Sequence, residues 1–134
     1  MELIYVILAD AAQAHPDGKF SLLGGGIENI NAPTFPVFHP GLAMVVKLGA
    51  RAAEAEEPHD FRVDIAGPND FYVTAIALTG FRSTVSQDEP DHLVTFNLII
   101  NIPILVFSEP GTYFFHLYVG TQEVGNVPLN VQKM

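Results

Sequence analysis

The sequence contains no cysteine, and this absence excludes three kinds of protein. Without thiols there is no disulfide scaffold, no thiolate zinc site and no cysteine nucleophile. Basic residues are also scarce, because six Lys and Arg face fifteen Asp and Glu for a formal net charge of −9. A chain with this balance has no electrostatic basis for holding a phosphate backbone. We therefore expect no nucleic-acid partner.

Long apolar runs are missing as well. A membrane-spanning helix needs about 20 apolar residues, and the longest candidate run, residues 98–107, is broken by Asn101 and Pro103. The apolar run near the N-terminus covers only residues 3–8 and follows Glu2, with no Lys or Arg before it. That is not the pattern of a secretory signal. These features predict no membrane partner and a cytoplasmic location.

The composition is that of a folded protein. Apolar residues make up 49% of the chain and charged residues 16%, which excludes disorder as its main state. A length of 134 residues is that of one ordinary domain. The chain has no internal repeat and no low-complexity linker, so we expect residues 1–134 to form a single domain.

Alternating apolar and polar residues predict strands along most of the chain. The clearest case is residues 60–65, where Phe61, Val63 and Ile65 alternate with charged side chains. Residues 92–107 are predicted to form two strands joined by a bend at Pro103, because proline cannot donate to a ladder. Residues 31–40 hold three prolines and are predicted to be a loop. Residues 49–58 are predicted to form at most two helical turns or a solvated loop.

These runs amount to eight or nine short strands, with a polar loop expected at residues 82–91. A parallel sheet would need helical crossovers, and the sequence offers none. The pattern therefore predicts an all-β protein built as an antiparallel sandwich or barrel.

Two predicted turns end in a glycine, the residue that adopts the left-handed conformation such turns need. Gly18 ends the sequence His15-Pro16-Asp17-Gly18, and Gly111 ends a second Pro-Gly turn. Tyr113 follows this second turn, which resembles the entry to a late strand of immunoglobulin-like sandwiches. There a Tyr bonds back to the backbone and pins the corner. The resemblance implies that role for Tyr113 and an immunoglobulin-like sandwich for the chain.

A broader likeness covers nearly the whole chain. The shared motifs are Ala9-Asp10, Asp17-Gly18-Lys19, Leu23-Gly24-Gly25-Gly26, Phe35-Pro36, His59 opening a strand, Pro110-Gly111-x-Tyr113-x-Phe115, Val119-Gly120 and Pro128-Leu129-x-Val131. On these residues the chain resembles an uncharacterised family of small bacterial proteins, a domain of unknown function. The resemblance implies a sandwich fold and supplies no activity, substrate or catalytic residue.

No pattern in the sequence assigns a catalytic, cofactor-binding or metal-binding residue. None of the histidines lies two to five residues from another, so no local zinc pair exists; they are His15, His39, His59, His92 and His116. The serines lack a Gly-x-Ser-x-Gly context; they are Ser21, Ser83, Ser86 and Ser108. Ligands or a Ser–His–Asp set can still converge from distant strands.

Three further features are interpreted as structural. Residues 24–26 are three glycines without the Lys-Ser/Thr of a phosphate loop, which predicts a bulge or a close backbone approach. Asp10 interrupts an apolar segment and is expected to cap backbone amides. The acidic residues 88–91 lack the ligand pattern of a calcium loop and are expected to be solvated.

Apolar side chains occupy both faces of several strands. Phe114, His116 and Tyr118 lie opposite the expected core face of their strand. Tyr72 lies opposite Phe71, and Ile76 and Leu78 are expected on the same face as Tyr72. The first strand is apolar on both sides. A two-layer sandwich buries one face of each sheet, so an apolar outer face indicates an interface. The alternative is that loops such as residues 31–40 cover this face within the monomer.

These observations favour a non-enzymatic protein-interaction or structural module that self-associates as a homo-oligomer, with a dimer as the simplest form. Its interface candidates are Phe114, His116, Tyr118 and Tyr72, and a protein partner remains open. The first alternative is a small-ligand binder with an apolar pocket. The second is a metal-assisted enzyme that uses histidines gathered from strand ends.

Overall fold

Strands form most of the computed structural model, which describes residues 1–70, 72–81 and 93–134. The described residues form twelve strands, the four-residue helix α1 (Ala52–Ala55) and the short 3-10 helix η1 (Pro68–Asp70). The protein is therefore all-β, as the sequence predicted. Phe71, His92 and the polar loop expected at residues 82–91, including its acidic residues, lie outside the described residues.

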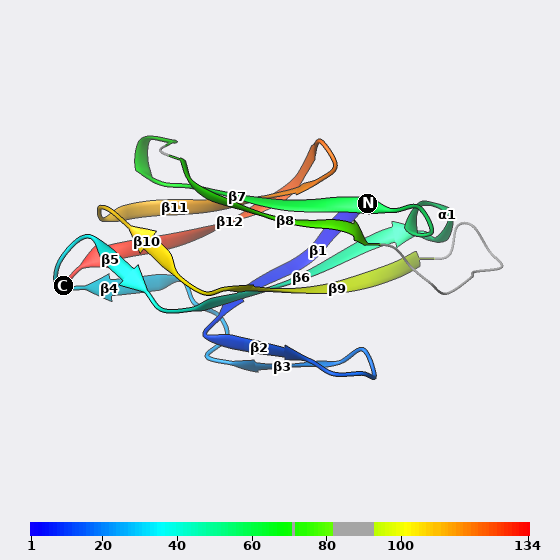
Figure 1. The fold of residues 1–134 in the computed structure, drawn as a ribbon, viewed down its shortest axis with the longest axis horizontal. Coiled ribbons are helices and arrows are strands. Elements are labelled where there is room, and N and C mark those ends of the chain that lie inside the picture. The colour runs from blue at the N-terminus through cyan, green and yellow to red at the C-terminus, as the bar shows by residue number, and fades with distance from the viewer. Residues whose placement is uncertain (71, 82–92) are drawn as a thin grey trace.

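Two sheets face each other across the core (Figure 1). The three-stranded sheet has the order β1-β6-β9, and all of its pairs are antiparallel. Its strands are β1 (Glu2–Ala9), β6 (Leu42–Arg51) and β9 (Leu93–Ile102).

The five-stranded sheet has the order β4-β12-β11-β7-β8. Its strands are β4 (Asn29–Ala32), β12 (Gln122–Lys133), β11 (Gly111–Val119), β7 (His59–Ala66) and β8 (Tyr72–Phe81). The β12–β4 pair is parallel, so the prediction of antiparallel pairing throughout was wrong at this edge. The two strands lie nearly a hundred residues apart in the chain, so the intervening strands replace the helical crossover on which the prediction relied.

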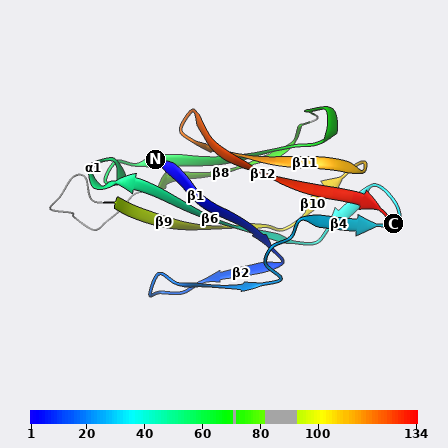
Figure 2. The ribbon, with the colours of Figure 1, turned by 180° about the vertical axis from the view of Figure 1, so that it is seen from behind.

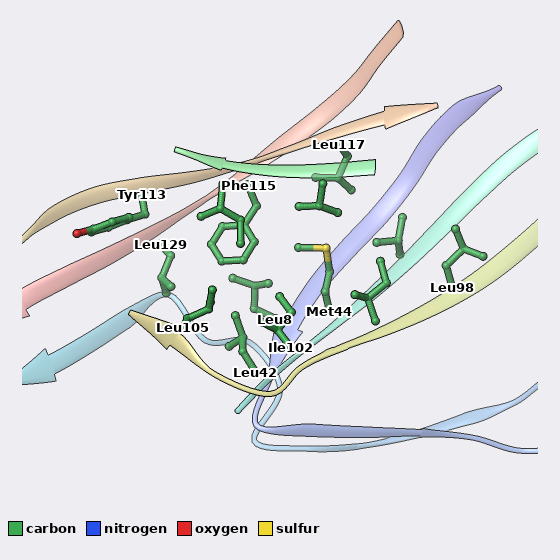
Figure 3. Packing of buried hydrophobic residues seen from close by; sticks show 14 of the residues in the cluster. Leu8, Leu42, Met44, Leu98, Ile102, Leu105, Tyr113, Phe115, Leu117 and Leu129 are labelled. Carbon is green, nitrogen blue, oxygen red and sulfur yellow. The ribbon is translucent and has the colours of Figure 1, made fainter. Parts of the chain in front are cut away.

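Alternation along the strands supplies the core between the sheets. Phe61, Val63 and Ile65 of β7 are buried, as are Phe115 and Leu117 of β11. All five belong to one cluster with residues of the three-stranded sheet, and Figure 3 shows Phe115 and Leu117 on the side of Leu8, Met44 and Leu98. Each large side chain that leaves water in this way contributes about 1.5–3 kcal/mol.

A β-hairpin lies on the other side of the three-stranded sheet (Figure 2). Its strands β2 (Ala11–Ala14) and β3 (Phe20–Leu23) pair with each other, and β2 lies against β6 and β9. Val45 and Ala43 of β6 face this hairpin and are 0% and 1% exposed. The outward apolar face of β6 is therefore covered within the monomer by this hairpin.

The ladder of β6 and β9 continues, after a break, as a short ribbon. Strand β5 (Val37–His39) pairs with β10 (Leu105–Phe107) beyond Pro40 and Pro103. The bend predicted at Pro103 is confirmed. The loop predicted for residues 31–40 contains β5, because prolines can flank a three-residue strand without lying in its ladder. The predicted count of eight or nine strands was low because β5 was not expected and because the short strands β2 to β4 were not separated from their neighbours.

The corner before β11 is held by a side chain to backbone bond. The Tyr113 hydroxyl donates to the carbonyl oxygen of Glu109 at 2.7 Å. Its ring packs edge-on against Phe107, with ring centroids 4.8 Å apart. Tyr113 is 1% exposed, so its hydroxyl reaches this partner at the rim of the core. The bond is the one that the sequence predicted for this residue.

Glycine is required at Gly111 for two separate reasons. Its φ is +146°, a region that side chains disfavour. A Cβ there would also overlap the ring of Pro68. Gly18 has a φ of +84° in the hairpin turn, and a Cβ there would meet no atom within 4 Å.

The substitution Tyr113→Phe removes the hydrogen bond to Glu109 and leaves the Glu109 carbonyl oxygen without this donor. We expect a loss of about 1–2 kcal/mol in the free energy of unfolding, measured by urea denaturation. Tyr72→Phe is the control, because the Tyr72 side chain is 60% exposed and should change stability by no more than about 0.5 kcal/mol. Equal losses of unfolding free energy in the two variants would contradict the proposal that the Tyr113 hydroxyl stabilises this corner.

Gly111→Ala and Gly18→Ala form a matched pair, since both place an alanine at positive φ. Only the first also creates an overlap, with Pro68. We expect Gly111→Ala to lose at least about 1 kcal/mol more unfolding free energy than Gly18→Ala. Thermal denaturation followed by circular dichroism measures both, and equal shifts would show that the Pro68 contact has no cost.

Candidate functional site

The outer face of the five-stranded sheet, which is the face turned away from the three-stranded sheet, carries the four residues predicted as an interface. One row across this face is apolar. It runs from Pro128 of β12 through Phe114 of β11 and Ala66 of β7 to Tyr72 of β8. Phe114 is 38% exposed and Tyr72 is 60% exposed. The structure therefore brings two of the four predicted residues into one row.

A bulge places Tyr72 on this face. Tyr72 pairs with Ala66 while Thr74 pairs with Ile65, so the register shifts between these pairs. Without the extra residue, Tyr72 would share a face with Ile76 and Leu78, as the sequence predicted. The prediction was wrong for Ile76 and Leu78, because they pair with the buried residues Val63 and Phe61 on the inner side. Ala75 and Ala77 lie on the outer face in their place.

The other two predicted residues are held in charged contacts. His116 Nδ1 lies 2.6 Å from Glu123 Oε1. Arg62 stacks over the Tyr118 ring, 4.5 Å from its centroid, and its Nε donates to Asp64 at 2.9 Å. His116 and Tyr118 therefore belong to a polar part of the face. A face-to-face contact would have to remove these charges from water.

Strand β8 is the free edge of the five-stranded sheet over the described residues, since only β7 pairs with it. Its ten residues, YVTAIALTGF, include no charged residue and no proline. Most edge strands are short or carry a lysine, a proline or a bulge that discourages pairing with another chain. Two register shifts against β7 interrupt this strand, one between Tyr72 and Thr74 and one between Leu78 and Phe81, while residues 74–78 pair without a shift. The sequence pattern identified the strand, but its place at an edge follows only from the tertiary pairing.

The remaining edges differ from β8. The opposite edge of the five-stranded sheet, β4, has four residues. In the three-stranded sheet, β1 begins with Glu2 and its Leu3 lies against Gly125 of β12. Strand β9 also lacks charges, but the hairpin lies against it. Among the described strands, β8 combines length, absence of charge and an exposed apolar row beside it.

The residues with metal-binding chemistry stay apart. Within residues 1–70, 72–81 and 93–134, no group of three His, Cys, Asp or Glu side chains gathers around one point. His59 donates through Nε2 to the Glu54 carbonyl oxygen at 2.7 Å, and His39 lies in β5. His15 lies in the hairpin turn, and His92 lies outside the described residues.

The glycines at residues 24–26 form a close backbone approach. Gly24 has a φ of +61°, and a Cβ there would overlap the carboxylate of Asp10. The Asp10 amide donates to the carbonyl oxygen of Leu23 at 3.0 Å. This segment joins the hairpin to the body of the protein and has no features of a phosphate loop.

Two hollows bear on the small-ligand alternative. A groove of about 560 Å³ lies on the hairpin, and one of about 450 Å³ lies near the N-terminus beside Gly49 and Leu93. Both are open to solvent, whereas a small-ligand site typically encloses most of its ligand. The ligand-binding alternative placed its pocket between the two sheets or at their mouth, and neither of these two hollows lies between the sheets.

No helix in the described part of the chain is long and apolar enough to cross a membrane. A family model described as a family of unknown function (DUF6941) matches residues 4–132. No curated protein and no solved structure matches the chain.

Proposed function

Because the chain belongs to DUF6941, a family of unknown function, we propose a function from its own geometry: it is a non-enzymatic interaction module that self-associates. Two copies pair along β8 and form a two-fold dimer. The observation that carries this proposal is the edge of β8, which pairs only with β7 among the described residues, is ten residues long and contains no charge or proline.

The proposal includes an immunoglobulin-like sandwich as the scaffold. Its support is the pairing pattern, in which β6 with β9 matches strands B and E, and β7-β11-β12 matches C, F and G. Strand β8 then takes the place of the additional strand beside C in variable-type domains. The bond from Tyr113 to Glu109 matches the corner that these domains use.

The backbone of β8 supplies the attraction. An edge strand presents N–H and C=O groups whose best partners are those of another strand. Pairing β8 with its own copy joins the two five-stranded sheets into one continuous sheet. Because the two strands are related by a two-fold axis, the contact closes on itself and yields a dimer rather than a fibre.

The net charge of the chain favours the edge of β8 over other surfaces as the place where a second copy binds. The chain carries −9, so two copies repel each other over most of their surface. A contact that contains no charged side chain avoids the largest local repulsion and the cost of removing charges from water. The apolar row that ends at Tyr72 adds side-chain contact beside the paired backbones.

Self-association could also occur through the outer face of the five-stranded sheet, but fewer observations support this contact than support pairing along β8. It would bury Phe114 together with His116, Tyr118 and the charges of Arg62, Asp64 and Glu123. The small-ligand and metal-assisted alternatives gain no comparable observation from the described residues. A bacterial source and a cytoplasmic location stay predictions.

A lysine placed on the inner side of the edge tests the proposal. Leu78 is 42% exposed, so the ammonium of Leu78→Lys reaches water in the monomer, whereas a paired copy would bury it. We expect at least about a 100-fold weaker dimer, from about 3 kcal/mol of uncompensated burial. Sedimentation velocity over a range of concentrations measures the change.

Ile4→Lys is the matched control, because Ile4 is 43% exposed and lies on β1 of the other sheet. Its dimer should match that of the unmodified chain. The double variant Phe114→Ser with Tyr118→Ser tests the sheet-face contact, and we expect it to stay associated. A monomeric unmodified chain, or dissociation by the control and not by Leu78→Lys, would refute pairing through β8.

A further inference from the structure

The outward side of the hairpin carries a serine and a histidine in direct contact. Ser21 Oγ lies 2.7 Å from His15 Nε2. Gln13 pairs with Ser21 across the hairpin, and both are exposed, whereas the next pair, Ala12 and Leu22, is half-buried toward the sheet. Gln13, His15 and Ser21 therefore share the face that points away from the body of the protein.

Backbone bonds hold His15 in place. Its amide donates to the Lys19 carbonyl oxygen at 2.9 Å, and its carbonyl oxygen accepts from the Gly18 amide at 3.2 Å. The Asp17 carboxylate accepts from the Lys19 amide at 3.1 Å and closes the same turn. The imidazole therefore projects from a fixed turn onto the Ser21 hydroxyl, so the pair does not depend on a flexible loop.

The groove of about 560 Å³ begins beside this serine. Its lining is apolar apart from the Ser21 hydroxyl and the Gln13 amide, and consists of Ala11, Ala12, Gln13, Ser21, Leu22 and Leu23. Leu23 is 72% exposed and pairs with Ala11 at the far end from His15. An apolar chain in this groove would place a polar end group at Ser21.

We propose that Ser21 is an acyl-acceptor site, activated by His15, for esters or thioesters with a short apolar acyl group. A serine hydroxyl within hydrogen-bond reach of an imidazole is the arrangement of an activated nucleophile. Oγ attacks the acyl carbonyl carbon and the bond to the leaving oxygen or sulfur breaks. The Oγ proton passes to His15 Nε2 and then to the leaving group, which departs as an alcohol or thiol. The Gln13 amide lies opposite Ser21 and supplies a donor for the oxyanion.

The product is a stable acyl-serine rather than a turnover cycle. Over the described residues, no carboxylate bonds to His15, so the imidazole lacks the third group of a triad. The site lies on the hairpin outside the three-stranded sheet, whereas β8 belongs to the five-stranded sheet. It is therefore independent of the proposed dimer contact.

The full chain is incubated with p-nitrophenyl acetate, and acetylated positions are followed over time by peptide mass spectrometry. Exposed Ser108 is the internal reference. We expect Ser21 to gain its acetyl group about 100-fold faster than Ser108, the lower range of general-base catalysis. His15→Gln should remove this difference, and Ser21→Ala should leave no acetyl group at this position. The ratio of the acylation rate of Ser21 to that of Ser108 should be several-fold larger with p-nitrophenyl butyrate than with p-nitrophenyl acetate, because the groove holds the longer acyl chain.

His116→Gln is the control, since it removes another half-buried surface histidine that contacts a polar side chain. It should leave the Ser21 rate unchanged. Circular dichroism confirms that each variant is folded. Acetylation of Ser21 at the rate of Ser108, an unchanged rate in His15→Gln, or an acetyl group found only on His15 or Lys19 would overturn the proposal.

Discussion

Burial of β6 on both of its faces is the constraint on which the rest of the structure depends. Met44 and Val46 face the five-stranded sheet, and Val45 and Ala43 face the hairpin, with none more than 1% exposed. A strand apolar on both sides needs a covering layer on each side. The five-stranded sheet supplies one layer, and β2 with β3 supplies the other. The hairpin therefore belongs to the core arrangement, even though it lies outside the two facing sheets.

This arrangement determines which surfaces stay open. The hairpin covers the outer face of the three-stranded sheet, and the polar contacts of His116 and Arg62 occupy much of the opposite outer face. Among the described residues, the edge of β8 and the outward side of the hairpin stay open. The first offers unpaired backbone to another strand, and the second offers a serine and histidine beside an apolar groove. The place of the hairpin follows from the demand that β6 be covered on both faces, and the edge position of β8 follows from its pairing with β7 alone among the described strands.

Local pattern predicted much of the fold. Alternation identified β7 and β11 and the core side of each, Pro103 marked the bend before β10, and the turn at Gly111 with Tyr113 indicated the corner bond. The errors came from non-local effects. The bulge beside Tyr72 and the inward side of Ile76 depend on the register with β7. The parallel pairing of β4 with β12, and the contact of His15 with Ser21, depend on segments that meet only in the folded chain.

Amide hydrogen exchange across β8, measured at rising protein concentration, tests the central claim most directly. In the monomer, amides that point toward the free edge are hydrogen-bonded to water and exchange quickly. Pairing of two copies places these amides in a ladder, so exchange in β8 should slow as the dimer forms while exchange in β1 stays constant. Exchange in β8 that does not change with concentration would contradict association through this edge.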